Sequence, residues 1–161
     1  MDLIPKASNW EERVRKSFGS QAFMNHLGVK VAHVAPGGVD LELEMQPELT
    51  QQHGFFHAGV TSSIADSAAG YAALTLFAED AGVLTSEYKI NLLNPAKQSI
   101  LLARGRVVKP GRTLTIARAD VYGLDDNGQV HVATGLFTLM SVSGVKDLIY
   151  DEYHRSPADP G

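Results

Sequence analysis

Residues 51–77 read QQHGFFHAGVTSSIADSAAGYAALTLF. We expect the other segments of the chain to pack around this stretch. From residue 58 to residue 77 it consists of small and apolar residues, broken by the single acid Asp66 and a few Ser and Thr residues. A helix that is apolar on all sides has to be enclosed by other elements. Its polar residues argue against a membrane span. The stretch therefore predicts one long, buried helix over residues 58–77.

Several segments around this helix carry the pattern of half-buried strands, in which apolar and polar residues alternate with a period of two. In VDLELEM, residues 39–45, the apolar residues occupy one face and the acids occupy the other. The cluster Asp-Asp-Asn-Gly at residues 125–128 predicts a hairpin turn between two later strands. The expected strands cover residues 29–35, 39–45, 83–93, 99–108, 113–123 and 130–142, and the first two form a hairpin.

Two short helices are expected before the first strand. Residues 8–18 predict an amphipathic helix, because Trp10, Val14 and Phe18 are four positions apart and form one apolar stripe. Residues 21–27 predict a second, shorter helical turn.

The order of the predicted elements indicates an α+β fold. No βαβ repeat is present, which disfavours a parallel sheet of the Rossmann type. We expect one antiparallel sheet curled around the central helix, within a single domain over residues 1–161. Its core covers about residues 25–142, preceded by a helical extension over residues 1–24 and followed by a loose tail over residues 143–161.

Composition excludes several classes of function. The 161 residues carry a formal net charge of −4 with scattered Lys and Arg, so there is no basic footprint for nucleic acid. The chain has no cysteine, which excludes disulfides and a cysteine nucleophile and fits a reducing compartment. The first residues are polar and lack the apolar core of a signal peptide. We therefore predict a cytoplasmic protein with no nucleic-acid or membrane partner.

The start of the central helix carries a spaced set of polar and small residues. They are Gln51, Gly54, His57, Ala58, Gly59 and Asp66. Two later turns read NPA at residues 94–96 and KPGR at residues 109–112. This pattern resembles the PaaI-type acyl-CoA thioesterase family of the hotdog fold, which typically reads Asn-x-x-Gly-x-x-His-Gly-Gly with an acid nine residues after the His. The resemblance covers roughly residues 25–142.

Two positions depart from the family pattern. Gln51 replaces the usual asparagine, although some hotdog thioesterases that act on aromatic acyl-CoAs use Gln there. Ala58 replaces the first glycine, but the family uses the backbone N–H at this position, and alanine has one provided that its φ and ψ suit a Cβ.

The resemblance implies hydrolysis of an acyl-CoA to a free carboxylic acid and CoA, without a metal or a cofactor. It makes Asp66 the nucleophile or general base, places Thr85 near that acid, and gives Gln51 the role of orienting the water or the thioester carbonyl. A helix N-terminus offers unpaired N–H groups and a positive dipole end, which suit an oxyanion. We therefore assign the oxyanion site to the N–H of Ala58, together with Gly59.

The residues around Asp66 support this assignment independently. All its neighbours three and four positions away are small, which leaves room for a substrate or a second subunit. They are Ser62, Ser63, Ala69 and Gly70. Asp66 lies about 12 Å along the helix axis from Ala58, too far for one substrate molecule to touch both within a chain. We therefore predict a homo-oligomer, either a dimer or a dimer of dimers, with the site between two subunits.

Residues outside the helix supply candidates for binding the substrate. Phe55 and Phe56 either line the acyl pocket or staple the start of the helix to the core. The KPGR turn is either a solvent-exposed hairpin or a site for CoA phosphates, which cationic side chains bind well. The candidates there are Lys109, Arg112 and Arg106, with Arg104 nearby.

Two alternatives to hydrolysis remain open. His57 is either a structural hydrogen-bonding group or an acid–base residue, and a pair of His57 with Asp66 would suit a hydratase or dehydratase of acyl thioesters. Ala58 in place of glycine leaves room for a non-catalytic acyl-CoA binder. His53 and His57 are four residues apart, but Gly54 and the turn between them disfavour a metal site.

Overall fold

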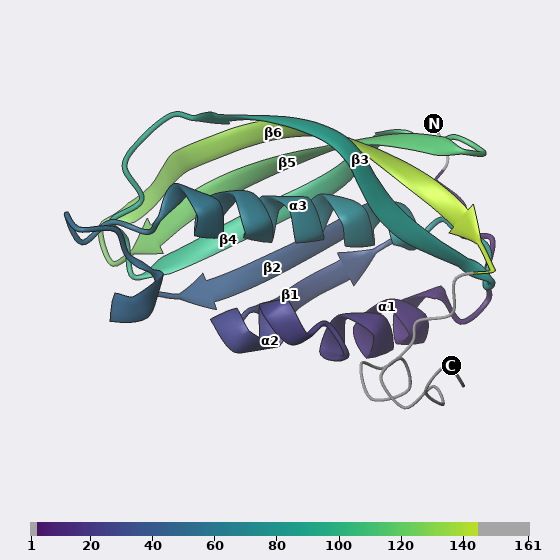
Figure 1. Cartoon of the computed structure of the whole chain (residues 1–161), viewed down its shortest axis with the longest axis horizontal. Coiled ribbons are helices and arrows are strands. Elements are labelled where there is room, and N and C mark those ends of the chain that lie inside the picture. Colours follow the sequence, from purple (N-terminus) through teal and green to yellow (C-terminus); the bar gives the residue numbers. More distant parts are fainter. Residues whose placement is uncertain (1–2, 145–161) are drawn as a thin grey trace, which may run out of the picture.

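The computed structural model describes residues 3–144. Its elements are α1 (Trp10–Gly19), α2 (Ala22–Leu27), β1 (Lys30–Ala35), β2 (Gly38–Glu44), the 3₁₀ helix η1 (Pro47–Leu49), α3 (Ala58–Leu74), β3 (Ala81–Leu92), β4 (Ile100–Lys109), β5 (Leu114–Asp125) and β6 (Gly128–Ser143) (Figure 1). Every predicted helix and strand is present, and η1 is an addition. Of the loose tail expected over residues 143–161, residues 145–161 lie outside the described part, and Ser143 still belongs to β6.

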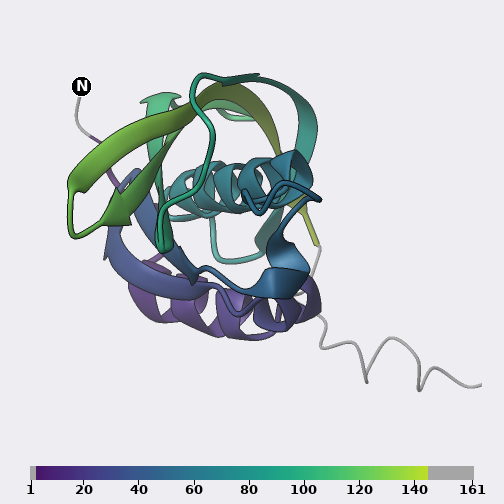
Figure 2. The ribbon, with the colours of Figure 1, turned by 90° about the vertical axis from the view of Figure 1, so that its left-hand side faces the viewer.

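The six strands form one antiparallel sheet in the order β1-β2-β4-β5-β6-β3. The sheet curls around α3, as the view turned by 90° from Figure 1 shows (Figure 2). The chain leaves the sheet after β2, passes through α3 and returns at the far edge as β3. This confirms the predicted architecture of a single antiparallel sheet around one central helix.

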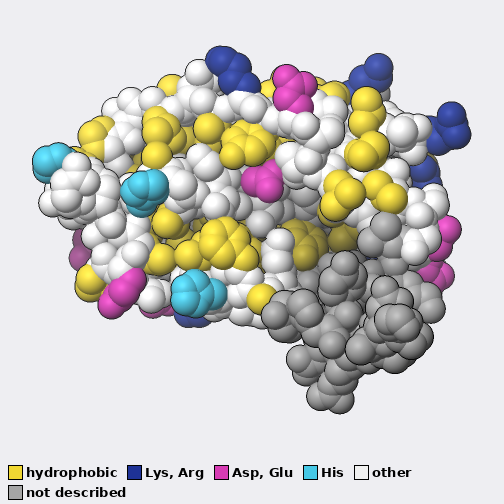
Figure 3. All heavy atoms as spheres, viewed as in Figure 1, with side chains coloured by type: hydrophobic (Ala, Val, Ile, Leu, Met, Phe, Trp, Pro, Cys, Tyr) yellow, Lys and Arg dark blue, Asp and Glu magenta, His cyan; other side chains and the backbone are white. Residues whose placement is uncertain are grey.

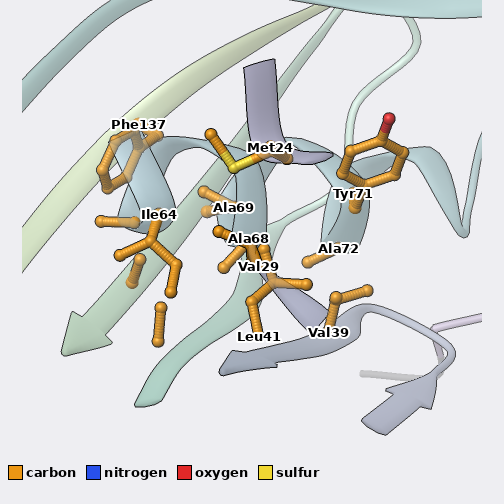
Figure 4. Close-up of a cluster of buried hydrophobic side chains, with 14 of the residues drawn as sticks. Met24, Val29, Val39, Leu41, Ile64, Ala68, Ala69, Tyr71, Ala72 and Phe137 are labelled. Carbon is orange, nitrogen blue, oxygen red and sulfur yellow. The ribbon is translucent and has the colours of Figure 1, made fainter. Parts of the chain in front are cut away.

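The sheet and α3 approach each other closely, because both sides contribute small residues. Five alanines of α3 are completely buried: Ala65, Ala68, Ala69, Ala72 and Ala73. On β4, Gly105 faces them, and a Cβ placed on Gly105 would lie 2.1 Å from the carbonyl oxygen of Ala68. Larger side chains fill the space around this contact, among them Phe137 from β6 and Met24 from α2 (Figure 4).

The helix α3 ends three residues earlier than the apolar run predicts. The hydroxyl of Thr75 donates to the carbonyl oxygen of Ala72 and accepts from the N–H of Gly37, both at 2.7 Å. The chain then leaves the helix, yet Leu76 and Phe77 stay buried. The run of apolar residues therefore predicts burial over its whole length and helix over most of it.

The N-terminal helix α1 covers the C-terminal half of α3. Val14 and Phe18 of its predicted stripe are buried, and the Phe18 ring meets the Tyr71 ring edge-on with centroids 5.3 Å apart. Arg13 donates to the carbonyl oxygens of Ala78 and Ala81. The N-terminal half of α3 is left more open, and this half carries the predicted site.

The contact at Gly105 makes a first prediction. Gly105→Ala should lower the free energy of unfolding by about 3 kcal/mol or more, because the new Cβ would press against the backbone of α3, which cannot yield as a flexible side chain can. Urea denaturation measures the loss. Gly19→Ala is the matched control, since a Cβ there meets nothing within 4 Å and should change the stability little. Equal stability of the two variants would contradict the close approach.

Candidate active site

A pocket of about 380 Å³ opens at the start of α3, where the loop before this helix meets the loop after β3. Gln51, Phe55, Phe56, Ala58, Thr61, Leu92, Leu93, Asn94, Pro95, Ala96 and Val132 line it. None of these lining residues is charged, and most are apolar. The structure thus places four of the predicted site residues, Gln51, Phe55, Phe56 and Ala58, in one cavity.

Backbone hydrogen bonds between distant segments hold the walls of this pocket. The N–H of Phe56 donates to the carbonyl oxygen of Ala96 at 2.8 Å, which explains why the NPA turn accompanies the helix start in the sequence. The N–H of His57 donates to the carbonyl oxygen of Leu49 at 2.9 Å. The lining is therefore fixed on both sides by main-chain contacts.

Gln51 is held in a tight turn before the helix. Its carbonyl oxygen accepts from the N–H of Gly54, whose φ of 79° requires glycine, and its own N–H donates to the carbonyl oxygen of Phe55. Its side-chain oxygen accepts from the N–H of His53. The side-chain amide group of Gln51 is therefore oriented at the edge of the pocket.

At the helix start, one backbone N–H is left free and its neighbour is not. His57 caps α3, and its ring atom Nδ1 accepts from the N–H of Gly59 at 2.9 Å. The carbonyl oxygen of His57 accepts from the N–H groups of Val60 and Thr61. The N–H of Ala58 has no acceptor among residues 3–144, and Ala58 is exposed. The free donor at the positive end of α3 is therefore that of Ala58.

Asp66 lies two turns further along α3 and is half-buried. The hydroxyl of Thr85, on β3, donates to its Oδ1 at 2.7 Å, so the structure brings these two predicted residues together. Burial raises the pKa of the Asp66 carboxyl above its ordinary value, and the hydrogen bond from Thr85 offsets only part of that rise. Asp66 is thus a desolvated carboxylate in a fixed orientation.

The two halves of the predicted chemistry do not meet within one chain. Asp66 does not line the pocket, and eight residues of helix, about 12 Å, separate it from Ala58. Between them α3 carries the small side chains of Ser62 and Ser63, which project little and are only half-buried. Hydrophobic side chains gather around this face, over β3 and the N-terminal helices (Figure 3).

The strand β3 borders this face, and within the described residues it is an edge strand that leaves one side of its backbone unpaired. Three of its large apolar side chains are about half exposed, with Leu84 at 53%, Tyr88 at 48% and Leu92 at 54%. A long, apolar edge strand of this kind is a template on which another chain can pair. The edge is therefore a suitable surface for a second copy of the chain.

The predicted basic residues lie away from the pocket of their own chain. Arg106 pairs with Asp40 of β2 at 2.5 Å. Arg104 lies over the ring of Tyr122, 4.9 Å from its centroid. The turn with Lys109 and Arg112 is at the opposite end of α3.

A second pocket of about 340 Å³ lies at this opposite end. Arg112 lines it together with Lys6, Leu76 and Phe77. The helix α3 spans about 25 Å, so this pocket and the one at Ala58 are well separated within a chain.

The sequence did not predict several of the residues that line the first pocket. Thr61 follows Ala58 by one helical turn, and this spacing alone could have indicated it. Leu92, Leu93 and Val132 could not be found in this way, because they join the pocket only through the pairing of β3 with β6.

Within residues 3–144, no three His, Asp or Glu side chains come together as a metal site. No helix in the same part of the chain is long and apolar enough to span a membrane.

Comparisons with known proteins agree with this fold. A family model described as the thioesterase superfamily matches residues 53–129. A solved thioesterase family protein from Silicibacter pomeroyi is 47% identical, with a TM-score of 0.82, over 84% of this chain and 99% of that one. A protein of Saccharolobus solfataricus that carries a provisional esterase name is 30% identical over 78% of this chain and 82% of its own length. The PaaI protein of E. coli, from the phenylacetic acid degradation operon, is 17% identical with a TM-score of 0.76, over 87% of this chain and 98% of that one, and shows the same fold.

The cap at the helix start makes a second prediction. His57→Ala should lower the free energy of unfolding by about 1 kcal/mol, because the N–H of Gly59 loses its acceptor. His57→Asn should recover most of this loss, since asparagine is a favourable N-cap residue. Urea denaturation of both variants checks the expectation. Equal stability of the wild type and His57→Ala would contradict a stabilising cap by the ring of His57.

Proposed function

The chain belongs to the thioesterase superfamily, and on that premise we propose that it hydrolyses acyl-CoA thioesters to a carboxylic acid and CoA in a site shared by two subunits. The observation that carries the proposal is the free N–H of Ala58, which opens on an uncharged, mostly apolar pocket at the positive end of α3. The similarity to proteins named thioesterase and esterase supports the hydrolysis of an ester bond. The proposed reaction needs no metal and no cofactor besides the CoA of the substrate.

In the proposed reaction, the N–H of Ala58 donates to the carbonyl oxygen of the thioester and stabilises the negative charge that develops on it. The carboxylate of Asp66 from the other subunit either takes a proton from water, whose oxygen then bonds to the carbonyl carbon, or attacks that carbon itself. In both cases the carbon–sulfur bond breaks, and the thiolate of CoA takes up a proton and leaves as the thiol. Direct attack leaves the acyl group on Asp66 as a mixed anhydride, which water then hydrolyses to release the carboxylic acid and restore the carboxylate. Because burial raises the pKa of Asp66, its carboxylate is a better base than an exposed one.

The shared site follows from the distance between Ala58 and Asp66. A two-fold axis between two antiparallel α3 helices would place Asp66 of one subunit opposite Ala58 of the other. A contact between two subunits on this face is favoured by the half-exposed apolar side chains of β3. It is also favoured by the small side chains of Ser62 and Ser63, which let a second helix come close to α3. The dimer is thus part of the proposal for catalysis.

The same two-fold arrangement would bring basic residues of one subunit close to the pocket of the other, where CoA binds in this proposal. Antiparallel helices bring the C-terminal end of one α3 toward the N-terminal end of the other. The turn with Lys109 and Arg112 then lies on the side of the partner's pocket, where these cations could bind CoA phosphates.

A third prediction concerns Asp66. Asp66→Asn should reduce thiol release from acyl-CoAs by about 10³-fold or more, because it removes the group that activates water or attacks the carbonyl. The pKa of Asp66 is raised on folding, so its ionised form opposes folding when the pH exceeds that pKa. The variant should therefore be at least as stable as the wild type at pH 7, and this advantage should shrink as the pH falls through the pKa. Normal turnover by the folded variant would contradict the assignment.

A fourth prediction concerns the N–H of Ala58. Ala58 is the first residue of α3, where proline is well tolerated, and the ψ of 140° at His57 suits a residue that precedes proline. Ala58→Pro should remove the donor, keep the helix and lower kcat by about 10²–10³-fold. Ala58→Gly is the control, since it retains the N–H. An unchanged kcat in the folded proline variant would exclude this donor.

Mixed dimers of these two variants distinguish a shared site from one within a single chain. When Asp66→Asn and Ala58→Pro chains are co-expressed, each mixed dimer contains one site with both groups intact. We expect about one quarter of the wild-type activity, because random pairing makes half of the dimers mixed. If the site lay within one chain, the mixture would be as inactive as its components.

A further inference from the structure

Thr61 carries a hydroxyl that the proposed hydrolysis does not use. As a whole residue Thr61 is 1% exposed, and it lines the pocket one turn after Ala58. Two other hydroxyls of this helix region donate back to carbonyl oxygens at 2.7 Å, Ser63 to Gly59 and Thr75 to Ala72. Among the residues that the structure describes, the hydroxyl of Thr61 makes no hydrogen bond, yet it is not fully sealed off, because Gln21 Oε1 is the one fully buried side-chain polar atom there without a partner.

A hydroxyl that has no partner in the protein and only a small opening to solvent depends on that opening for its hydrogen bonds. The open side of Thr61 is the pocket, so the missing bond can be made by whatever occupies that pocket. The surrounding side chains, such as Phe55, Leu92 and Val132, are apolar and make no competing bond. Thr61 is therefore suited to recognise one polar group on an otherwise apolar ligand.

The pocket fits the acyl group better than the CoA part of the substrate. None of its lining residues is a cation that would bind phosphates. Nor is there a cation for a second carboxylate on the acyl chain, so the recognised group should be uncharged. Along the helix axis, Thr61 lies about 4.5 Å beyond Ala58, whose N–H binds the thioester oxygen in the proposed reaction. An oxygen on the third carbon of the acyl chain lies at a similar distance from the thioester oxygen.

We propose that Thr61 is a specificity-determining residue, whose hydroxyl binds a hydroxyl or carbonyl oxygen on the third carbon of the acyl group. This inference rests on the proposed thioesterase function and narrows its substrate class to acyl-CoAs with an uncharged oxygen near the thioester. A site that hydrogen-bonds such an oxygen discriminates against the analogue that lacks it, because that analogue would cover the hydroxyl and leave it unpaired.

The test compares 3-hydroxyhexanoyl-CoA with hexanoyl-CoA in a thiol-release assay. The wild type should give the higher kcat/KM with the hydroxylated substrate. Thr61→Val keeps the shape of the side chain without its hydroxyl and should lower the ratio of the two kcat/KM values by about fivefold to tenfold. Thr61→Ser keeps the hydroxyl and should preserve the preference.

Two outcomes would overturn the proposal. If Thr61→Val lowered kcat/KM for both substrates by the same factor, the hydroxyl would serve the thioester or the CoA part. If the ratio did not change, the hydroxyl would play no part in selection.

If the wild type hydrolysed neither substrate, the proposed hydrolysis would be wrong for these esters, and binding would still test Thr61. Calorimetric titration with the two non-hydrolysable thioether analogues should then show the same preference in the wild type. Loss of this preference in Thr61→Val would support the proposal, and an unchanged preference would overturn it.

Discussion

At the centre of the molecule, the carbonyl oxygen of Ala68 occupies the space where any side chain at position 105 would begin. The backbone of α3 thus lies almost directly against the backbone of β4, and only glycine and alanine can face each other there. A helix made of such small residues buries little apolar volume of its own. The sheet therefore has to curl around it, and large side chains such as Phe137 and Leu101 supply the rest of the core.

The same small residues shape the functional surface. Because α3 carries few bulky side chains, no large side chain projects from its uncovered face around Ser62 and Ser63. Asp66 is therefore partly desolvated by its surroundings but stays half-buried and is not fully enclosed. The helix begins outside the enclosed region, so the N–H of Ala58 remains free at the surface. The requirement for small residues in α3 thus keeps both Asp66, in the middle of the helix, and the N–H of Ala58, at its start, accessible on the side where a second subunit can lie.

The sequence predicts the elements well because their patterns are local. The alternation in residues 39–45 and the turn at residues 125–128 depend only on neighbours along the chain. The start of α3 is equally local, so Gln51, Phe55 and Ala58 fall into one pocket. The bond from Thr85 to Asp66 was indicated only through the family resemblance, because it depends on β3 crossing back over α3. The position of the KPGR turn, at the far end of a helix about 25 Å long, depends on the strand order, which no local pattern encodes.

The substitution of glycine by alanine at position 58 can be understood from the two roles at the helix start. No residue other than glycine has a positive φ in the described chain, so Ala58 adopts an ordinary helical conformation and needs no conformational freedom. Position 58 has to supply only an N–H. Position 59 is different, because a Cβ there would lie 2.9 Å from Nδ1 of His57 and would displace the ring that caps the helix. The second glycine is thus required by the cap, whereas the first can be replaced by alanine without loss of the donor that the proposed chemistry uses.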